Sequence, residues 1–83
     1  MISVLFFAQL REQLGQTRVE ISADSPMPLE TLMSRLGEHL GSEALAFLRA
    51  ENIRIAVNQA LLDGPINIRP GDEVAFLPPV TGG

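Results

Sequence analysis

The sequence predicts an α+β domain in which a mixed sheet of four to five strands is crossed by one main helix. Strand-like segments at both ends of the chain and an amphipathic segment between them support this prediction. The 83 residues are 46% apolar and 19% charged, which suits one folded domain and excludes a disordered protein. If the first and last strands are neighbours, they must be parallel, with the helix crossing one face of the sheet.

Two strands are predicted before the helix. Residues 2–8 are rich in β-branched and aromatic side chains, which favours a central strand buried on both faces. Residues 9–14 are expected to form a short helix that ends at Gly15, where a left-handed backbone is allowed. Residues 17–22 alternate polar and apolar, so we expect a half-buried strand that pairs antiparallel with the first.

The main helix is predicted from apolar residues at helical spacing. It begins near Pro28 and ends at Gly41. Its apolar residues are Leu29, Leu32, Met33, Leu36 and Leu40. Residues 42–51 hold a second apolar cluster, and we expect one or two further helical turns there.

Three strands are predicted in the last third of the chain. Residues 53–58 alternate, which indicates a strand with one face toward the helix. Residues 66–68 are expected to form a short strand after a turn at 63–65, and residues 74–77 the last strand after a turn at 70–72.

The chain ends in Pro78-Pro79-Val80-Thr81-Gly82-Gly83. Two prolines lack the N–H groups that a sheet needs, so we divide the chain into a domain at 1–77 and an extended tail at 78–83. At about 3.3–3.6 Å per residue, the last five residues reach roughly 17 Å. Gly82 and Gly83 have no side chains, which suits a narrow channel in another protein.

Composition limits the chemistry. With no cysteine, the chain has no thiol to carry a persulfide or to bind zinc, and with no lysine it has no side-chain amine to accept an isopeptide bond. A net charge of −4 makes nucleic acid an unexpected partner. Residues 1–3 lack the basic start of a signal peptide and no apolar run approaches the ~18 residues of a membrane span, so we expect a cytoplasmic protein.

The carboxylate of Gly83 is the candidate reactive group. A carboxylate becomes electrophilic only with a leaving group such as the AMP of an acyl-adenylate, and sulfur attack on that adenylate leaves a thiocarboxylate. Elsewhere the acidic residues are scattered, His39 stands alone, and no phosphate-binding glycine loop occurs. We therefore expect no catalytic machinery and no metal site in the chain itself, and the activating chemistry must come from other proteins.

Three segments carry a resemblance that spans the whole chain. They read L-F-F-A-Q-L-R-E at residues 5–12, A-V-N-Q at 56–59 and G-D-E-V-A-F-L-P-P-V-T-G-G at 71–83. With them the chain resembles the small subunits of molybdopterin synthase. The last segment is the most specific, because thiamin-pathway sulfur carriers share the Gly-Gly end and the Gly-Asp turn but typically lack the Phe-Leu-Pro-Pro-Val-Thr run. Leu77 stands where many members look aromatic, and residues 59–64 are less typical of the family.

The resemblance implies a β-grasp, ubiquitin-like fold and a sulfur carrier in molybdenum cofactor biosynthesis. An adenylating enzyme of the ubiquitin-activating type would use ATP to make the Gly83 acyl-adenylate. The large subunit of a heterotetrameric synthase would then receive the Gly83 thiocarboxylate and pass its sulfur to cyclic pyranopterin monophosphate. The chain itself would bind no cofactor and would act as the sulfur-donor subunit of a sulfurtransferase.

Strand alternation suggests where these partners bind. If Ile2, Val4 and Phe6 face the helix with Val74 and Phe76, the side chains between them form an apolar patch on the opposite face. The candidate interface residues are Leu5, Phe7, Ala75 and Leu77, together with Leu61 and with Arg11 at the rim.

Three alternatives remain open at this stage. The chain can serve as a sulfur carrier of another pathway, such as thiamin synthesis or tRNA thiolation. It can be a non-catalytic β-grasp interaction module with an idle tail, or a protein modifier joined through Gly83 to lysines of other proteins. A thiocarboxylate at Gly83 distinguishes the carriers from the module, and covalent adducts identify the modifier.

Overall fold

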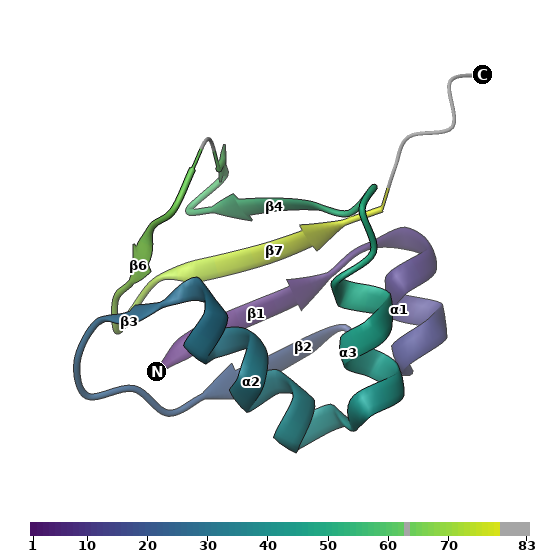
Figure 1. The fold of residues 1–83 in the computed structure, drawn as a ribbon, viewed down its shortest axis with the longest axis horizontal. Helices are drawn as coiled ribbons and strands as arrows, with labels where there is room; N and C mark the ends of the chain where they lie inside the picture. The colour runs from purple at the N-terminus through teal and green to yellow at the C-terminus, as the bar shows by residue number, and fades with distance from the viewer. Residues whose placement is uncertain (63, 79–83) are drawn as a thin grey trace.

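The computed structural model describes residues 1–62 and 64–78. Its main sheet has the strand order β2-β1-β7-β4-β5, and the helices cover one face of it, as Figure 1 shows. The sheet strands are β1 (Ile2–Phe6), β2 (Arg18–Ile21), β4 (Arg54–Val57), β5 (Ala60–Leu61) and β7 (Glu73–Leu77). The helices are α1 (Ala8–Leu14), α2 (Leu29–Leu40) and α3 (Ser42–Leu48).

The first and last strands are parallel neighbours, as predicted. Val4 lies opposite Val74 and Phe6 opposite Phe76, and β2 pairs antiparallel with the other edge of β1. Because β1 and β7 run in the same direction, the end of β7 that leads into the tail lies beside the end of β1. This topology, with α2 crossing the sheet, confirms the predicted β-grasp arrangement.

The helices and the inner face of the sheet form the core. Leu32, Met33 and Leu36 of α2 are buried, and Gly41 ends that helix as predicted. The rings of Phe6 and Phe76 lie 5.9 Å apart between their centroids. The inward residues of the three central strands alternate with outward ones because a strand has a period of two. They are Ile2, Val4, Phe6, Ile55, Val57, Val74 and Phe76.

One predicted strand belongs to a different sheet. Residues 66–68 were predicted to form a short strand, and β6 (Asn67–Ile68) does so, but it pairs antiparallel with β3 (Met27–Pro28) in a separate two-stranded sheet. The fifth strand of the main sheet is β5, which the sequence pattern did not indicate. Two residues are too few to show a period of two, and the turn before β5 contains no glycine to mark it.

The prediction that the first strand is buried on both faces is wrong. Ser3 and Leu5 are half-buried, whereas Ile2, Val4 and Phe6 between and beside them are buried. No described element covers the outer side of β1, because α2 and α3 both lie on the other face. Within the described residues, no helix is long and apolar enough to cross a membrane.

Candidate functional site

Most of the predicted reactive tail lies outside the described residues. Pro79, Val80, Thr81, Gly82 and Gly83 are in this part of the chain. Pro78 is the last described residue; it is half-buried and follows β7 directly. The division into a domain at 1–77 and a tail at 78–83 therefore stays a prediction, although the last strand does end at Leu77.

The outer face, meaning the face of the main sheet opposite α2 and α3, carries a row of apolar side chains. Leu5 of β1 lies opposite Ala75 of β7, which lies opposite Ala56 of β4, and Ala56 in turn lies opposite Leu61 of β5. Residues in register on neighbouring strands point to the same face. Four of the five strands therefore contribute one apolar residue each to a continuous row.

The side chains of this row differ in exposure to solvent. Leu61 is 59% exposed at one end and Leu5 is half-buried at the other, while Ala75 is only 9% exposed and Ala56 is also buried. The two alanines in the middle of the row have shorter side chains than the leucines at its two ends. The sequence prediction that Ala75 faces outward is consistent with the register, but its neighbours cover most of it.

A second row lies closer to the tail. Leu77 of β7 is half-buried and lies opposite Arg54 of β4. Phe7, which follows β1, is 41% exposed and donates its backbone N–H to the carbonyl oxygen of Phe76 at 3.3 Å. Phe7, Leu77 and Arg54 therefore lie beside the point where the chain leaves the sheet.

The backbone bends sharply after Phe7. Ala8 has a φ of 51°, in the left-handed region that residues with a Cβ rarely adopt. Phe7 has extended angles and caps α1, and its carbonyl oxygen accepts the N–H of Leu10 at 3.1 Å. This corner ends β1 and starts α1 within one residue, so α1, the helix that contains Arg11, begins at the tail end of the sheet.

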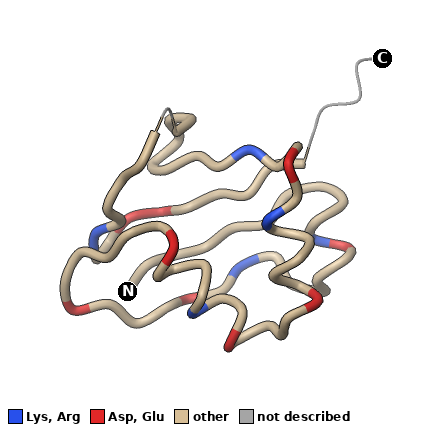
Figure 2. Tube along the Cα trace, in the orientation of Figure 1, with Lys and Arg blue, Asp and Glu red and all other residues tan. Residues whose placement is uncertain are grey.

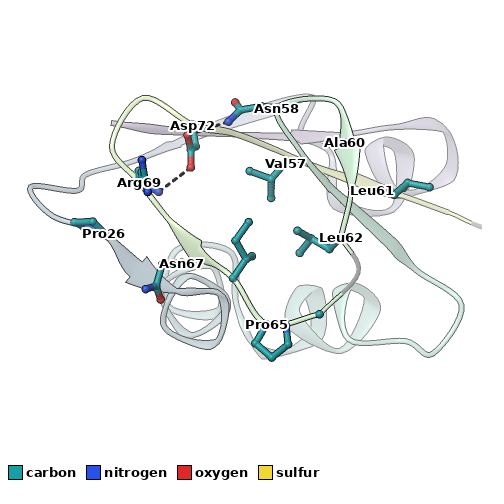
Figure 3. A pocket seen from close by; sticks show the side chains of 12 residues that line it. Pro26, Val57, Asn58, Ala60, Leu61, Leu62, Pro65, Asn67, Arg69 and Asp72 are labelled. Carbon is teal, nitrogen blue, oxygen red and sulfur yellow. Dashed lines mark hydrogen bonds between the residues drawn. The ribbon is translucent and has the colours of Figure 1, made fainter.

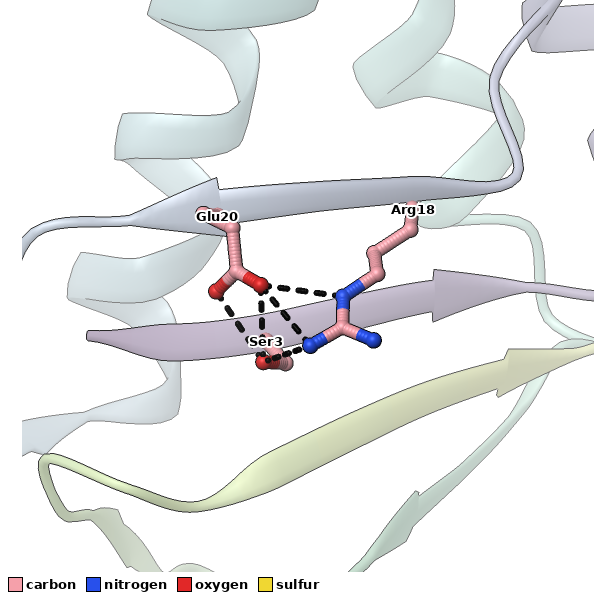
Figure 4. A network of polar contacts seen from close by, with 3 residues as sticks. All are labelled: Ser3, Arg18 and Glu20. Carbon is pink, nitrogen blue, oxygen red and sulfur yellow. Dashed lines mark hydrogen bonds and ion pairs between the residues drawn. The ribbon is translucent and has the colours of Figure 1, made fainter.

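Polar groups close the β2 edge of the outer face (Figure 4). Arg18 donates from Nε to Glu20 at 2.9 Å and from Nη2 to the Ser3 hydroxyl at 3.0 Å, and Ser3 donates to Glu20 at 3.0 Å. The Ser3 hydroxyl, and then the Arg18 guanidinium, lower the pKa of Glu20 below its ordinary value. Charged side chains on an edge strand discourage pairing with another chain.

At the end of the main sheet away from the tail, Asn58 hydrogen-bonds the residues at the start of β7. Its side chain donates to Asp72 at 3.0 Å and accepts the N–H of Glu73 at 3.0 Å, while its backbone N–H bonds the carbonyl oxygen of Glu73. The N–H of Arg69 donates to Asp72 at 2.8 Å, and this bond, followed by that from Asn58, lowers the pKa of Asp72. These hydrogen bonds stabilise the turn after β4, in the A-V-N-Q segment, and the turn before β7, in the G-D-E-V segment.

A cavity of about 710 Å³ lies at this same end of the molecule, shown in Figure 3. Val57, Leu62 and Ile66 supply apolar walls, and Asn58, Arg69 and Asp72 supply polar ones. Asp72 precedes β7 and the tail follows it, so the cavity is a strand length away from the tail. Among the described residues, no three His, Cys, Asp or Glu side chains gather as metal ligands do.

The structure therefore brings together most of the predicted interface residues. Leu5, Phe7, Ala75, Leu77 and Leu61 all belong to the outer face or its tail end, and Arg11 lies exposed on the adjacent helix α1. Sequence reasoning missed Ala56 and Arg54. Their alternation with Ile55 and Val57 already placed them on the outer face, but the small alanine and the exposed arginine gave no apolar signal.

Charge alone does not define the site. Figure 2 shows acidic and basic positions interspersed along the chain, and on β2 the pair Arg18 and Glu20 places both signs side by side. The outer face is an apolar row beside the end of β7, where the last described residue, Pro78, follows the strand.

Comparison with known proteins identifies the family of this chain. The chain matches the ThiS family over residues 4–83. The chain belongs to this family. It is also 46% identical over 83 residues to the molybdopterin synthase sulfur carrier subunit of Escherichia coli K12, with all of both chains covered. The resemblance predicted from the three sequence segments is thereby confirmed.

Solved structures of ThiS-like proteins agree in fold. One is a protein–protein complex of subunits 1 and 2 of molybdopterin-converting factor from Helicobacter pylori, 29% identical, covering 99% of this chain and 97% of that one, with a TM-score of 0.68. Another is SAMP1 from Haloferax volcanii, 24% identical, covering 99% and 98%, with a TM-score of 0.80. The second likeness supports the β-grasp fold alone.

Proposed function

We propose that this chain is the sulfur carrier subunit of a molybdopterin synthase and that the Gly83 carboxylate is its working group. The observation that carries the proposal is the full-length match to molybdopterin synthase sulfur carrier subunits, which includes the terminal Gly-Gly of residues 82–83. The outer face beside the tail supports it, because a carrier must bind each enzyme that handles its terminus.

The proposed chemistry takes place in two partners. In the first, an adenylating enzyme of the ubiquitin-activating type, a Gly83 carboxylate oxygen attacks the α-phosphorus of ATP, and pyrophosphate leaves. A sulfur nucleophile then attacks the Gly83 carbonyl carbon, AMP leaves, and a thiocarboxylate remains. In the second partner, the large subunit, the thiocarboxylate sulfur attacks a carbon of cyclic pyranopterin monophosphate and an oxygen leaving group departs from that carbon. Water then hydrolyses the bond between the Gly83 carbonyl carbon and the sulfur, so the sulfur stays on the pterin and the Gly83 carboxylate is restored. Neither ATP nor the pterin is bound by this chain alone.

The residues have separate roles in this proposal. Gly83 carries the sulfur, Gly82 allows passage through a narrow channel, and Thr81 and Val80 fill that channel. Pro78 and Pro79 end the sheet and direct the tail outward. Phe7, Leu5, Leu77 and Leu61 supply the apolar contact with both partners in turn, because the same tail must enter both active sites.

The large subunit is the partner best supported. The Helicobacter pylori relative was solved as a complex of subunits 1 and 2, and this chain covers 97% of that relative. We infer that the outer face of this chain binds a large subunit in the same way, within a heterotetramer of two small and two large subunits. The adenylating enzyme is inferred from the chemistry, since a free carboxylate does not accept sulfur without activation.

Mass spectrometry of the intact chain tests the proposal. Purified from cells that contain the activating system, part of the chain is expected to carry sulfur in place of one oxygen at Gly83. A variant with one residue added after Gly83 should carry none, because the reacting carboxylate is then an amide. One residue added before the exposed Met1, at the opposite end of β1, is the matched control and should leave sulfur loading unchanged.

Two results would count against the proposal. If the extended variant is loaded as well as the unmodified chain, Gly83 is not the sulfur-carrying residue. If loaded chain and large subunit fail to convert cyclic pyranopterin monophosphate in a reconstituted reaction, the pathway assignment is wrong and another sulfur acceptor must be sought.

A further inference from the structure

The six basic side chains of this protein are all arginine, and the structure separates them by what their guanidinium groups do. Arg18 bonds Glu20 and Ser3 through two different nitrogens. Arg49 bonds both carboxylate oxygens of Glu30, at 3.3 Å from Nη1 and 3.0 Å from Nη2. Both contacts use the planar fork of donors that lysine lacks, so arginine at 18 and 49 has a local structural reason.

Arg54, Arg11 and Arg69 lack such a reason. None of the three makes a side-chain hydrogen bond or an ion pair with another described residue, and all three are exposed. Two of them lie near the tail: Arg54 lies opposite Leu77, and α1 with Arg11 begins where β1 ends, next to the end of β7. For a merely solvated positive charge, lysine would serve equally well.

Lysine and arginine differ in nucleophilicity. The arginine side chain stays protonated, with a pKa above about 12, and has no free lone pair at neutral pH. A lysine amine, with an ordinary pKa of about 10.4, is neutral in part of the molecules and attacks activated acyl groups. In such an attack the amine nitrogen bonds the Gly83 carbonyl carbon, the bond to AMP breaks, and the amine proton goes to water.

We propose that Arg54 and Arg11 keep positive charge at the base of the tail in a form that the activated Gly83 cannot acylate, which leaves the sulfur donor without a competing side-chain amine. This inference rests on the proposed function, since it concerns the acyl-adenylate of that pathway. In this role Arg54 and Arg11 prevent attack of a side-chain amine on the activated Gly83 carbonyl carbon, and they take no part in sulfur transfer itself. We call this their fidelity role.

Chain length permits the side reaction. Gly83 is the sixth residue after Leu77, and six residues span at most about 20 Å. Residue 54 faces Leu77 in register, so a lysine there begins about 5 Å from the base of the tail. Arg69 lies before β7, at the opposite end of that strand, so a lysine at 69 is a strand length further away. Arg69 therefore offers a matched control.

The first experiment uses the activating enzyme with ATP and no sulfur source. The chain, Arg54→Lys, Arg11→Lys and Arg69→Lys are incubated separately and analysed by intact mass spectrometry. Arg54→Lys is expected to yield an internal amide one water lighter than the input, about tenfold more than Arg69→Lys, since the reacting groups are held on one molecule. Arg11→Lys should give the same product, and the unmodified chain should give none.

A second experiment removes the enzyme, so that poor binding of a variant cannot hide the reaction. Each variant is prepared with Gly83 as a thioester, and loss of the thiol is followed over time. Attack by the lysine forms the same amide and releases the thiol. Arg54→Lys should cyclise about tenfold faster than Arg69→Lys, and the unmodified chain, which has no lysine, should form no such amide.

The outcomes separate this inference from the proposed function. If ATP–pyrophosphate exchange shows no adenylation of the unmodified chain, the proposed function fails. If exchange proceeds and Arg54→Lys and Arg11→Lys keep full mass in both experiments, the fidelity role is refuted while the carrier function stands. Equal amide formation at 54 and 69 also refutes it, because position near the tail would then not matter.

Discussion

The inner and outer faces of the sheet are built from the same strands, yet they differ in almost every physical respect. Along β1 and β7, the inward residues Val4, Phe6, Val74 and Phe76 are fully or almost fully buried beneath α2 and α3. Outward neighbours such as Leu5 and Leu77 stay half-buried, and Phe7 and Leu61 are exposed. Apolar residues on the inner face stabilise the fold, whereas those on the outer face stay available to a partner.

This difference explains why an apolar outer face does not compromise folding. A small domain must bury enough apolar area on one side of its sheet to balance the loss of chain entropy. Once α2 and α3 cover the inner face, the outer residues contribute little more to stability. Substitutions on the two faces should therefore affect different properties: the free energy of unfolding on the inner face and partner binding on the outer face.

Truncation of an inner residue is expected to have the largest effect on stability. Phe76→Ala removes a fully buried ring that packs against Phe6 and should lower the free energy of unfolding by about 3–5 kcal/mol. Leu77→Ala, next in the chain but on the half-buried outer side, is the matched control and should cost about 1 kcal/mol or less. Urea denaturation measures both, and similar losses would contradict the contrast between faces.

Substitution on the outer face should affect binding instead. Phe7→Asp places a charge in the apolar patch beside the tail and should weaken binding to a large subunit at least about tenfold, or about 1.4 kcal/mol. The free energy of unfolding of the Phe7→Asp variant should differ from that of the unmodified chain by about 0.5 kcal/mol or less. Ile66→Asp, 38% exposed and outside the outer face, is the control for calorimetry. Equal affinities of the two variants would exclude Phe7 from the interface.

Asn58 tests whether the end of the sheet away from the tail is structural. Asn58→Ala removes the bonds to Asp72 and to the Glu73 N–H, and it leaves alanine at a φ of 51°. We expect a loss of about 1–2 kcal/mol in the free energy of unfolding, with binding to a large subunit unchanged. Asn67→Ala, an exposed asparagine of β6, is the control in thermal melts. Lost binding at preserved stability would place this end in the interface instead.

Acid should produce the smallest effect. The lowered pKa values of Glu20 and Asp72 mean that their charged forms stabilise the folded state above their ordinary pKa values of about 4. This stabilisation is lost as the pH falls through the lowered values, when the folded-state carboxylates take up protons. The free energy of unfolding is measured between about pH 7 and pH 2.5, a range in which both carboxyl groups change from charged to neutral. It should fall less with decreasing pH in the double variant Glu20→Gln, Asp72→Asn than in the unmodified chain. An unchanged acid dependence would mean that other groups determine it.

The fold was predictable where a periodic pattern was long enough. Leu29, Leu32, Met33 and Leu36 specify α2, and Gly41 and Gly15 mark helix ends where the structure shows them. The pattern failed for β3 and β5, because each has two residues, and it predicted β6 as a strand without its pairing to β3, which depends on segments distant in sequence. Burial of Ser3 and Leu5 was overestimated, because composition cannot reveal that only one face is covered.

The candidate site divides in the same way. Gly83 and the residues before it are identified by the terminal motif alone, and alternation already placed Leu5, Phe7, Ala75 and Leu77 on one face. Leu61 is also among the predicted interface residues, but the sequence could not show that Ala56 joins it to Ala75 in one row, because that register is set by hydrogen bonds across β4, β5 and β7. It also could not show that Arg54 faces the base of the tail.

The sequence by itself determined the local elements and the reactive chain end, since periodicity, glycine positions and the terminal residues act over a few neighbours. The tertiary structure alone decided which residues become neighbours across the sheet. Strand order and register arise from packing of the whole chain, so the outer face, the pairing of Ala56 with Ala75 across it, and the place of Arg54 opposite Leu77 exist only once the sheet has formed.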